Sequence, residues 1–430
     1  MWHLLFLGAA LGIEDPPIPL AAARAAFEEA REASDADGGH RWGVRLYGPT
    51  LFVDPATRFV VANRNDAEGL LAEREGVFTG TLPEREGIAN TATRWAGVTW
   101  TMVMWPLPED PASRTRLLIH ESFHRVAPEI GIPGSNPSNA HLETPDGRTW
   151  LRLERRALAQ ALILRGDERR RAIEDALVFR RYRRSLFSKA AEEERLLELN
   201  EGLAEYTGHA LSGLQPAILA RESSLRLERE DREASFARSF AYASGPAYGV
   251  LLDEAGAEWR RGLGANADLG ALLAEAIHWK PSAELSKEAQ ERAPRYDGEA
   301  VAAEERERAE AREAAVARHR ARYIEGPVLL LPLSGDVSYT FDPRRVEPIG
   351  DLDSVYGTLR VTDRWGILEA PGGALLTRAP AGNVASVRVP APKEAEGLFL
   401  AGEGWTLSLE KGWRVVPGAR SGDFTVSNER

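Results

Sequence analysis

The sequence predicts an α+β protein that ends in a separate all-β domain. Two changes along the chain support this class: short β-type runs with turns fill residues 42–106, and apolar residues at helical spacing follow from residue 108 to about residue 280. From Gly326 onward, short strands separated by Gly and Pro return. A chain of 430 residues also exceeds one ordinary hydrophobic core, so we expect more than one domain.

The β-rich part follows a short predicted helix at residues 21–33. Residues 44–63 (VRLYGPTLFVDPATRFVVAN) predict a hairpin whose turn is Asp54 to Thr57. Residues 77–83 (VFTGTLP) predict another strand. The strongest strand signal is 98–108 (VTWTMVMWPLP), which is rich in Trp, Thr and Val and ends at Pro106.

Six further segments have helical patterns. The first, residues 114–126 (RTRLLIHESFHRV), is entered from residues 110–113 and ends before Pro128. The others lie at residues 148–165, 168–186, 190–211, 247–252 and 268–277. Acidic residues lie among the arginines of residues 165–184, so we predict a solvated helix face there.

These patterns predict five parts of the chain. They are an N-terminal segment (residues 1–19), a β-rich part (20–107), a helical part (108–280), a charged helical connector (281–325) and a C-terminal β domain (326–430). The connector contains an Ala-rich helix at residues 299–322, in which Glu and Arg alternate. The C-terminal strands predict a sandwich or barrel.

Composition limits the partners and the location. The net charge of −11 opposes nucleic-acid binding, and the absence of cysteine excludes disulfides and thiolate metal ligands. The apolar run at residues 4–11 is too short to span a bilayer, but it resembles the centre of a secretory signal, with a cut after Gly12. We therefore predict export, periplasmic or secreted, with a cytoplasmic location as the alternative and no integral membrane span. The sequence predicts no oligomeric state.

The most specific motif is HExxH, at residues 120–124 (HESFH). Residues four apart lie on one helix face, so His120 and His124 can reach one metal ion. Glu121 lies one step around the helix and can act as the general base on a water. Imidazole and carboxylate ligands of this kind predict Zn²⁺.

A catalytic zinc site needs a third protein ligand. The metzincin pattern is excluded, because Ala127 and Ile130 stand where it needs Gly and His. His141, in a predicted loop, and Glu201, in a predicted helix, remain as the two candidates.

The segment Asn200-Glu201-Gly202-Leu203-Ala204-Glu205 resembles the glutamate helix of gluzincins, the clan of thermolysin and the zinc aminopeptidases. The resemblance implies that Glu201 is the third zinc ligand. It also implies that Glu205 bonds to the outer nitrogen of His120 and orients that ring. In this chain 76 residues separate His124 from Glu201, more than in many gluzincins, so we expect the helices at residues 148–186 to be an insertion that packs outside the site.

The resemblance further implies a zincin-like catalytic domain, in which a small sheet precedes a helical bundle and its edge strand pairs with the substrate. Residues 98–108 occupy the position of that edge strand. Tyr242, in the segment YASGPAY, resembles the tyrosine that stabilises the oxyanion, with Tyr248 and His209 as lesser candidates. The Gly-x-Met-Glu-Asn motif of zinc aminopeptidases is missing, which favours an endopeptidase.

The sequence therefore predicts a zinc-dependent peptidase that acts on peptide or protein substrates. Two alternatives remain. One is a non-catalytic protein that uses a gluzincin scaffold for binding or structure, and the other is a zinc hydrolase that acts on a non-peptide amide or ester.

Overall fold

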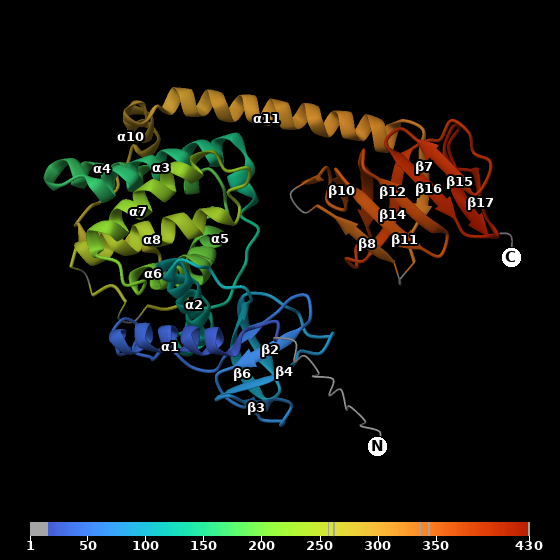
Figure 1. The fold of residues 1–430 in the computed structure, drawn as a ribbon. Coiled ribbons are helices and arrows are strands. Elements are labelled where there is room, and N and C mark those ends of the chain that lie inside the picture. Colours follow the sequence, from blue (N-terminus) through green and yellow to red (C-terminus); the bar gives the residue numbers. More distant parts are fainter. Residues whose placement is uncertain (1–15, 257, 261–262, 335–336, 343–344, 429–430) are drawn as a thin grey trace, which may run out of the picture. The chain divides into compact units, whose positions relative to one another are not determined.

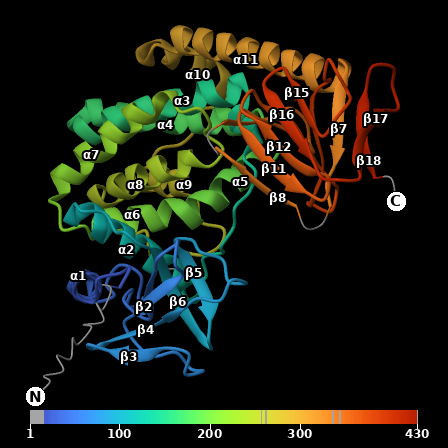
Figure 2. The same cartoon turned by 45° about the vertical axis from the view of Figure 1, so that its right-hand side comes forward.

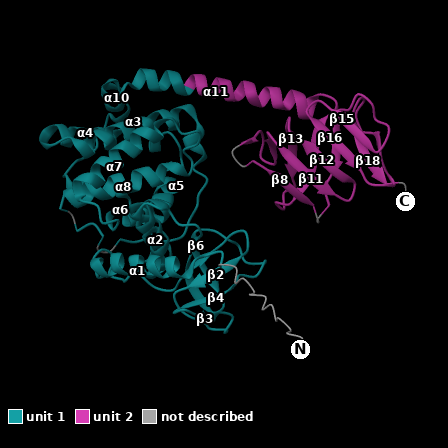
Figure 3. Ribbon diagram, viewed as in Figure 1, with its two compact units in different colours: residues 1–305 teal, residues 306–430 magenta. Residues whose placement is uncertain are grey.

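The computed structural model describes residues 16–428 except 257, 261–262, 335–336 and 343–344. The chain divides into two compact units, residues 1–305 and 306–430 (Figure 3). The boundary falls within α11 (Gly298–Arg320), the polar helix that the sequence predicted at residues 299–322. The predicted export signal falls mostly on residues 1–15 and so lies outside the described residues.

The first unit opens with α1 (Leu20–Asp37) and a mixed sheet, drawn in blue in Figures 1 and 2. Within the described residues the sheet has the order β3-β4-β2-β1-β6-β5. Its strands are β1 (Thr50–Val53), β2 (Phe59–Ala62), β3 (Ala72–Arg74), β4 (Val77–Thr81), β5 (Thr91–Trp95) and β6 (Val98–Met104). The predicted hairpin is confirmed: β1 and β2 are antiparallel, and Asp54 Oδ1 accepts from the Thr57 amide at 2.7 Å.

The prediction that residues 98–108 form the edge strand is wrong. β6 lies inside the sheet, parallel to β1 on one side and antiparallel to β5 on the other. Its Trp100, Met102 and Val103 side chains are buried, as an internal strand requires. The edge strand next to β6 is β5, which pairs with β6 alone among the described strands.

Two helices cover one face of this sheet. The Phe27 ring of α1 stacks on Phe52 of β1 with centroids 4.5 Å apart. Val103 of β6 and Leu118 of α2 (Pro111–Val126) belong to the same buried cluster. Helix α2 therefore joins the sheet to the helices that follow.

Those helices form a bundle around one large apolar core (Figure 1). They are α3 (Pro145–Ile163), α4 (Gly166–Ser185), α5 (Ala190–Leu197), α6 (Leu203–Ala210), α7 (Pro216–Arg229), α8 (Ser239–Glu254), α9 (Leu269–Ala276) and α10 (Leu285–Arg292). The helix predicted at residues 190–211 is interrupted by η3 (Glu198–Gly202), a turn of π-helix between α5 and α6. Helices α7 and α10 were not predicted. Helix α8 begins at Ser239, before the predicted 247–252, and Pro246 lies inside it.

Glycines let α6 approach α2 closely, and α8 approach η3. A Cβ on Gly208 of α6 would lie 2.4 Å from the carbonyl oxygen of Arg116 in α2. A Cβ on Gly245 of α8 would lie 2.3 Å from both the Cα and the oxygen of Gly202 in η3. Any larger side chain at these positions would push the backbones apart.

The predicted solvated arginine face is also wrong in its second half. Arg180 and Arg183 of α4 are buried and ion-paired with acids of α3, α5 and η3. The alternating charges looked like a surface helix, but the acids that pair with these arginines come from other helices. Helices α3 and α4, which were expected to pack outside the site, contribute no residue to the lining of the pocket that holds His120 and His124. Both contribute side chains to the main core.

The second unit contains two sheets that share a core. One has the order β17-β18-β7-β14-β13-β10-β9 and the other β15-β16-β12-β11-β8. Their strands are β7 (Val328–Pro332), β8 (Ser338–Phe341), β9 (Val346–Pro348), β10 (Asp353–Tyr356), β11 (Leu359–Asp363), β12 (Gly366–Ala370), β13 (Ala374–Arg378), β14 (Val384–Pro390), β15 (Phe399–Gly402), β16 (Trp405–Leu409), β17 (Trp413–Pro417) and β18 (Phe424–Asn428). Leu329 and Val387 from the first sheet pack with Leu368 and Leu407 from the second.

The prediction of an α+β protein with a C-terminal all-β region is thus confirmed. Across the described residues, no helix combines the length and apolar character needed to cross a membrane.

Candidate metal centre

Helix α2 presents both histidines of the HExxH motif to one pocket. The helix begins where Asp110 accepts a hydrogen bond from the Ser113 amide at 2.8 Å, with Pro111 in its first turn. His120 and His124 are one turn apart on the same face, and their Nε2 atoms lie 3.1 Å from each other. The motif is therefore rigidly placed on a capped helix.

Glu201 reaches the same point from η3. Its Oε2 lies 3.7 Å from His120 Nε2 and 3.4 Å from His124 Nε2. Among the described residues, these three side chains form the group whose ligand atoms converge as a metal site requires. The two motifs are 76 residues apart in sequence and meet at one point in space.

The dimensions of this triangle suit a tetrahedral metal ion. With ligand bonds of about 2.0–2.2 Å, two ligand atoms at a tetrahedral angle lie about 3.3–3.6 Å apart. The three separations found here are 3.1, 3.4 and 3.7 Å. Imidazole and carboxylate are also donors that Zn²⁺ accepts, so the residues fit such an ion.

Glu205 lies behind His120 and fixes its ring. Its Oε2 is 2.9 Å from His120 Nδ1, and its other oxygen is paired with Arg226. Burial raises the pKa of Glu205, but the bond to His120 and the charge of Arg226 outweigh it and lower the pKa to about 2. A carboxylate that stays ionised favours the His120 tautomer with its proton on Nδ1 and its Nε2 lone pair directed at the cluster.

The charges around His120 suit a bound cation. Burial alone would lower the pKa of His120, but its bonds to Glu201 and Glu205 raise it to about 10. The pKa of Glu201 is lowered, because bonds from both histidines and Tyr242 outweigh its burial. In the absence of metal, a proton on His120 offsets the charge of these acids, and a metal ion would take over that positive charge.

Glu121 is buried and its Oε2 has no hydrogen-bond partner among the described residues. A buried carboxylate oxygen without a partner is costly unless a ligand or water uses it. Burial raises the pKa of Glu121, and the charges of His120 and His124 oppose that shift. Glu121 is thus a free acceptor on the wall of the metal pocket.

Tyr242 of α8 completes the ring of side chains around Glu201. Its hydroxyl donates to Glu201 Oε2 at 2.6 Å, and its ring is stacked with His120 at a centroid distance of 5.9 Å. Arg238, one helical turn earlier, donates to Glu201 Oε1 at 3.0 Å. Sequence reasoning missed Arg238, although its position four residues before Tyr242 puts both on one helix face.

The other sequence candidates lie in different surroundings. His141 is paired with Glu194 at 2.8 Å, whereas His120 and His124 contact Glu201. His141 is therefore not part of the cluster in the metal pocket. Tyr248 is buried and donates to Glu154 at 2.7 Å, so its hydroxyl is used within the bundle. His209 is buried against the Leu219 carbonyl at 3.1 Å. The structure therefore places Tyr242, and neither of the lesser candidates, beside the cluster.

The cluster opens into a pocket of about 700 Å³. Along one wall runs the start of the edge strand, with Asn90, Thr91 and Ala92. Asn136, in the segment between α2 and α3, lines another part of the pocket. Its Oδ1 accepts a hydrogen bond from the side-chain Nδ2 of Asn200 at 3.3 Å. Neither β5 nor Asn136 was predicted as part of the site, since nothing local to either segment signals a pocket.

No protein-family model, curated protein or solved structure matches this chain.

Proposed function

We propose that this protein is a zinc-dependent hydrolase that cleaves peptide bonds, with a gluzincin-like, zincin-type catalytic region. One observation carries the proposal: His120, His124 and Glu201 form a triangle of tetrahedral dimensions, and the unpartnered carboxylate oxygen of Glu121 lies in the same pocket. This combination supplies three ligands, an open fourth position and a base.

His120, His124 and Glu201 would hold the ion, and Glu205 would keep the His120 ring in place. When bound, zinc would polarise the substrate carbonyl and lower the pKa of an attacking water to about 7. Glu121 would accept a proton from that water and pass it to the leaving amine. The Tyr242 hydroxyl would donate to the oxygen of the tetrahedral intermediate, once it is released from Glu201.

The edge strand supports a peptide as the substrate. The start of β5 lines the pocket, and β5 has a strand neighbour on one side only among the described strands. An extended peptide can add to such an edge by main-chain hydrogen bonds. Because this mode of binding does not need a free terminus, we propose an endopeptidase.

Substitution of the base tests this function. Glu121→Gln keeps the shape of the side chain but cannot accept the proton, so we expect kcat/KM on a cleaved peptide to fall about 10²–10⁴-fold with the zinc content unchanged. Glu129→Gln, the same change at an exposed position just beyond α2, is the matched control and should keep wild-type activity.

Three results would speak against parts of the proposal. Gently purified, folded wild type without stoichiometric zinc would indicate a non-catalytic protein. Zinc-loaded wild type that cuts no member of a peptide library would favour a non-peptide amide or ester. Cleavage that survives Glu121→Gln would mean that Glu121 is not the base.

A further inference from the structure

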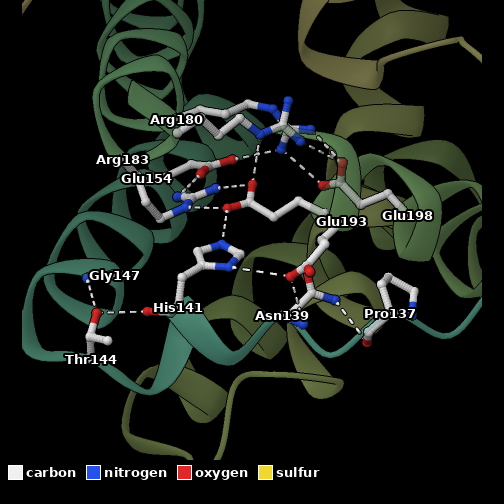
Figure 4. Close-up of polar contacts among 12 residues, drawn as sticks. Pro137, Asn139, His141, Thr144, Gly147, Glu154, Arg180, Arg183, Glu193 and Glu198 are labelled. Carbon is white, nitrogen blue, oxygen red and sulfur yellow. Dashed lines mark hydrogen bonds and ion pairs between the residues drawn. The ribbon is translucent and has the colours of Figure 1, made fainter. Parts of the chain in front are cut away.

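The helical bundle contains a fully buried group of charged residues, which we call the buried ion cluster, and one of its members lies in η3, the turn that carries Glu201. It consists of Glu154 (α3), Arg180 and Arg183 (α4), Glu194 (α5) and Glu198 (η3), each at most 2% exposed (Figure 4). Arg180 donates to Glu154 at 3.2 Å and to Glu198 at 2.9 Å. Arg183 donates to both Glu194 oxygens, at 2.8 and 2.7 Å, and is also paired with Glu154.

Further hydrogen-bond partners extend the cluster to two more elements. Ser244 of α8 donates to Glu198 Oε1 at 3.1 Å, and Tyr248 of α8 donates to Glu154 at 2.7 Å. His141, from the segment before α3, lies 2.8 Å from Glu194. The cluster therefore links α3, α4, α5, η3 and α8 through directional contacts.

Stability alone does not explain such a cluster. Removing charges from water costs several kcal/mol per ion, and apolar residues of similar size often stabilise a protein equally well. Ion pairs with forked arginines do, however, fix the angles and distances between the elements that carry them. The buried ion cluster is thus suited to setting geometry.

The geometry that it sets is that of η3. A π turn winds by a smaller angle per residue than an α turn, so Glu198 and Glu201, three residues apart, face different sides. Glu198 faces Arg180 and Ser244, whereas Glu201 faces the histidines of α2. Gly202 of the same turn packs on Gly245, next to Ser244. Fixing Glu198 therefore fixes the direction in which Glu201 leaves the turn.

We propose that Glu198, held by Arg180 and Ser244, is a positioning residue for the metal ligand Glu201. Its ion pair locks the π turn so that the Glu201 carboxylate stays at ligand distance from His120 and His124. The same contacts hold the segment of α8 that carries Tyr242, two residues before Ser244. This inference rests on the proposed function, because it requires that His120, His124 and Glu201 bind a metal ion.

Zinc affinity of the folded protein tests the proposal. The variant Glu198→Gln keeps the size of the side chain and removes the charge that Arg180 holds. We expect its Zn²⁺ dissociation constant, measured by competition with a chromophoric chelator, to rise about 10- to 100-fold. Asp175→Asn is the matched control: Asp175 is equally buried at 1%, and it is paired with Arg292 of α10 and with Arg295 just after that helix. None of the contacts found for Asp175 among the described residues involves η3. Asp175→Asn should lose thermal stability and bind Zn²⁺ like the wild type.

A milder variant covers the case in which Glu198→Gln does not fold. Ser244→Ala removes one hydrogen bond to Glu198 but leaves its ion pair with Arg180 intact, and should weaken Zn²⁺ binding about 2- to 10-fold. Wild-type affinity in every folded variant of Glu198 or Ser244, or an equal loss in Asp175→Asn, would overturn the positioning role and leave the zinc site intact. A wild type that binds no Zn²⁺ would instead overturn the proposed function, and this inference with it.

Discussion

The ring of His120 makes a contact through each of its nitrogens. Nδ1 is 2.9 Å from Glu205, and Nε2 is directed at His124 and Glu201. Glu205 is in turn held by Arg226 of α7, so two charged groups in series fix one imidazole. A ligand that is oriented in this way loses little conformational freedom when it binds a metal ion.

At the residue scale, the hydroxyl of Tyr242 is the group whose role a single substitution isolates. Tyr242→Phe removes the donor to the oxyanion and keeps the ring that stacks on His120. We expect kcat to fall about 10²-fold with little change in KM, as for the loss of one oxyanion donor. Steady-state kinetics on a cleaved peptide measures this.

Tyr182→Phe is the control for that substitution, because the Tyr182 hydroxyl contacts only Ser286 among the bonds found for it, at 3.3 Å. It should leave kcat unchanged. A Tyr242→Phe enzyme with wild-type kcat would remove Tyr242 from the mechanism.

At the element scale, the site depends on how closely α2, η3, α6 and α8 approach. Gly208 brings α6 against α2, and Gly202 and Gly245 bring η3 against α8. The ligands of α2 and η3 can therefore meet over distances that larger residues would not allow. Two of these glycines, Gly202 and Gly208, belong to the segment Asn200 to Ala210. This segment therefore provides the close helix contacts as well as the site residues Glu201 and Glu205.

Substitution of Gly245 tests this packing. In Gly245→Ala the new Cβ would lie 2.3 Å from the backbone of Gly202, so the two helices must separate. We expect the free energy of unfolding to fall by about 1–3 kcal/mol and Zn²⁺ binding to weaken as well. Urea unfolding and chelator competition measure the two effects.

Gly166→Ala serves as the comparison, because a Cβ there would meet no atom within 4 Å, although its φ of +58° adds backbone strain. It should lower stability and leave Zn²⁺ affinity unchanged. Unchanged stability and metal binding in Gly245→Ala would show that the close approach is not required.

At the scale of the whole molecule, the two units have separate hydrophobic cores, and α11 continues from one into the other. Most side chains of α11 beyond residue 305 are exposed, and several are arginines. Limited trypsin digestion should therefore cut first within residues 306–320 and leave two protected fragments. Mass spectrometry of a time course identifies the cut. Progressive degradation without stable fragments would contradict two independently packed units.

Acid should unfold the first unit through the buried ion cluster. Burial raises the pKa of Glu194, but the charges of Arg183 and Arg184 outweigh it and hold the pKa well below the ordinary value of 4.5. The folded state then binds fewer protons than the unfolded state, so the stability from this group is complete above pH 4.5 and is lost as the pH falls below it.

We expect the free energy of unfolding to decrease below that pH by up to about 1.4 kcal/mol per pH unit for each such carboxylate. Urea unfolding at a series of pH values, over about 4 units from pH 7 down to pH 3, measures this decrease in the free energy of unfolding. Glu194→Gln should be less stable at neutral pH and show a shallower decrease in acid. An equal slope in the variant would exclude Glu194 as a source of the acid sensitivity.

The sequence by itself determined the features that depend on near neighbours along the chain. The four-residue spacing of His120 and His124 places both on one helix face, and the turn at Asp54 to Thr57 follows from its own residues. The resemblance of residues 200–205 to a known motif pointed to Glu201 and Glu205, which the structure brings to the two histidines of α2. The class of the fold and the all-β C-terminal region followed from periodicity in the same way.

Only the tertiary structure decided which strand is the edge, which arginines are buried and how the π turn at residues 198–202 is held. Each of these depends on partners far away in sequence: β1 pairs with β6 and moves it inside the sheet, and Glu154, Glu194 and Glu198 draw Arg180 and Arg183 into the bundle. Local patterns record the propensity and polarity of a segment. They do not record which distant segment will cover it, and burial, strand order and ion pairing are set by that covering segment.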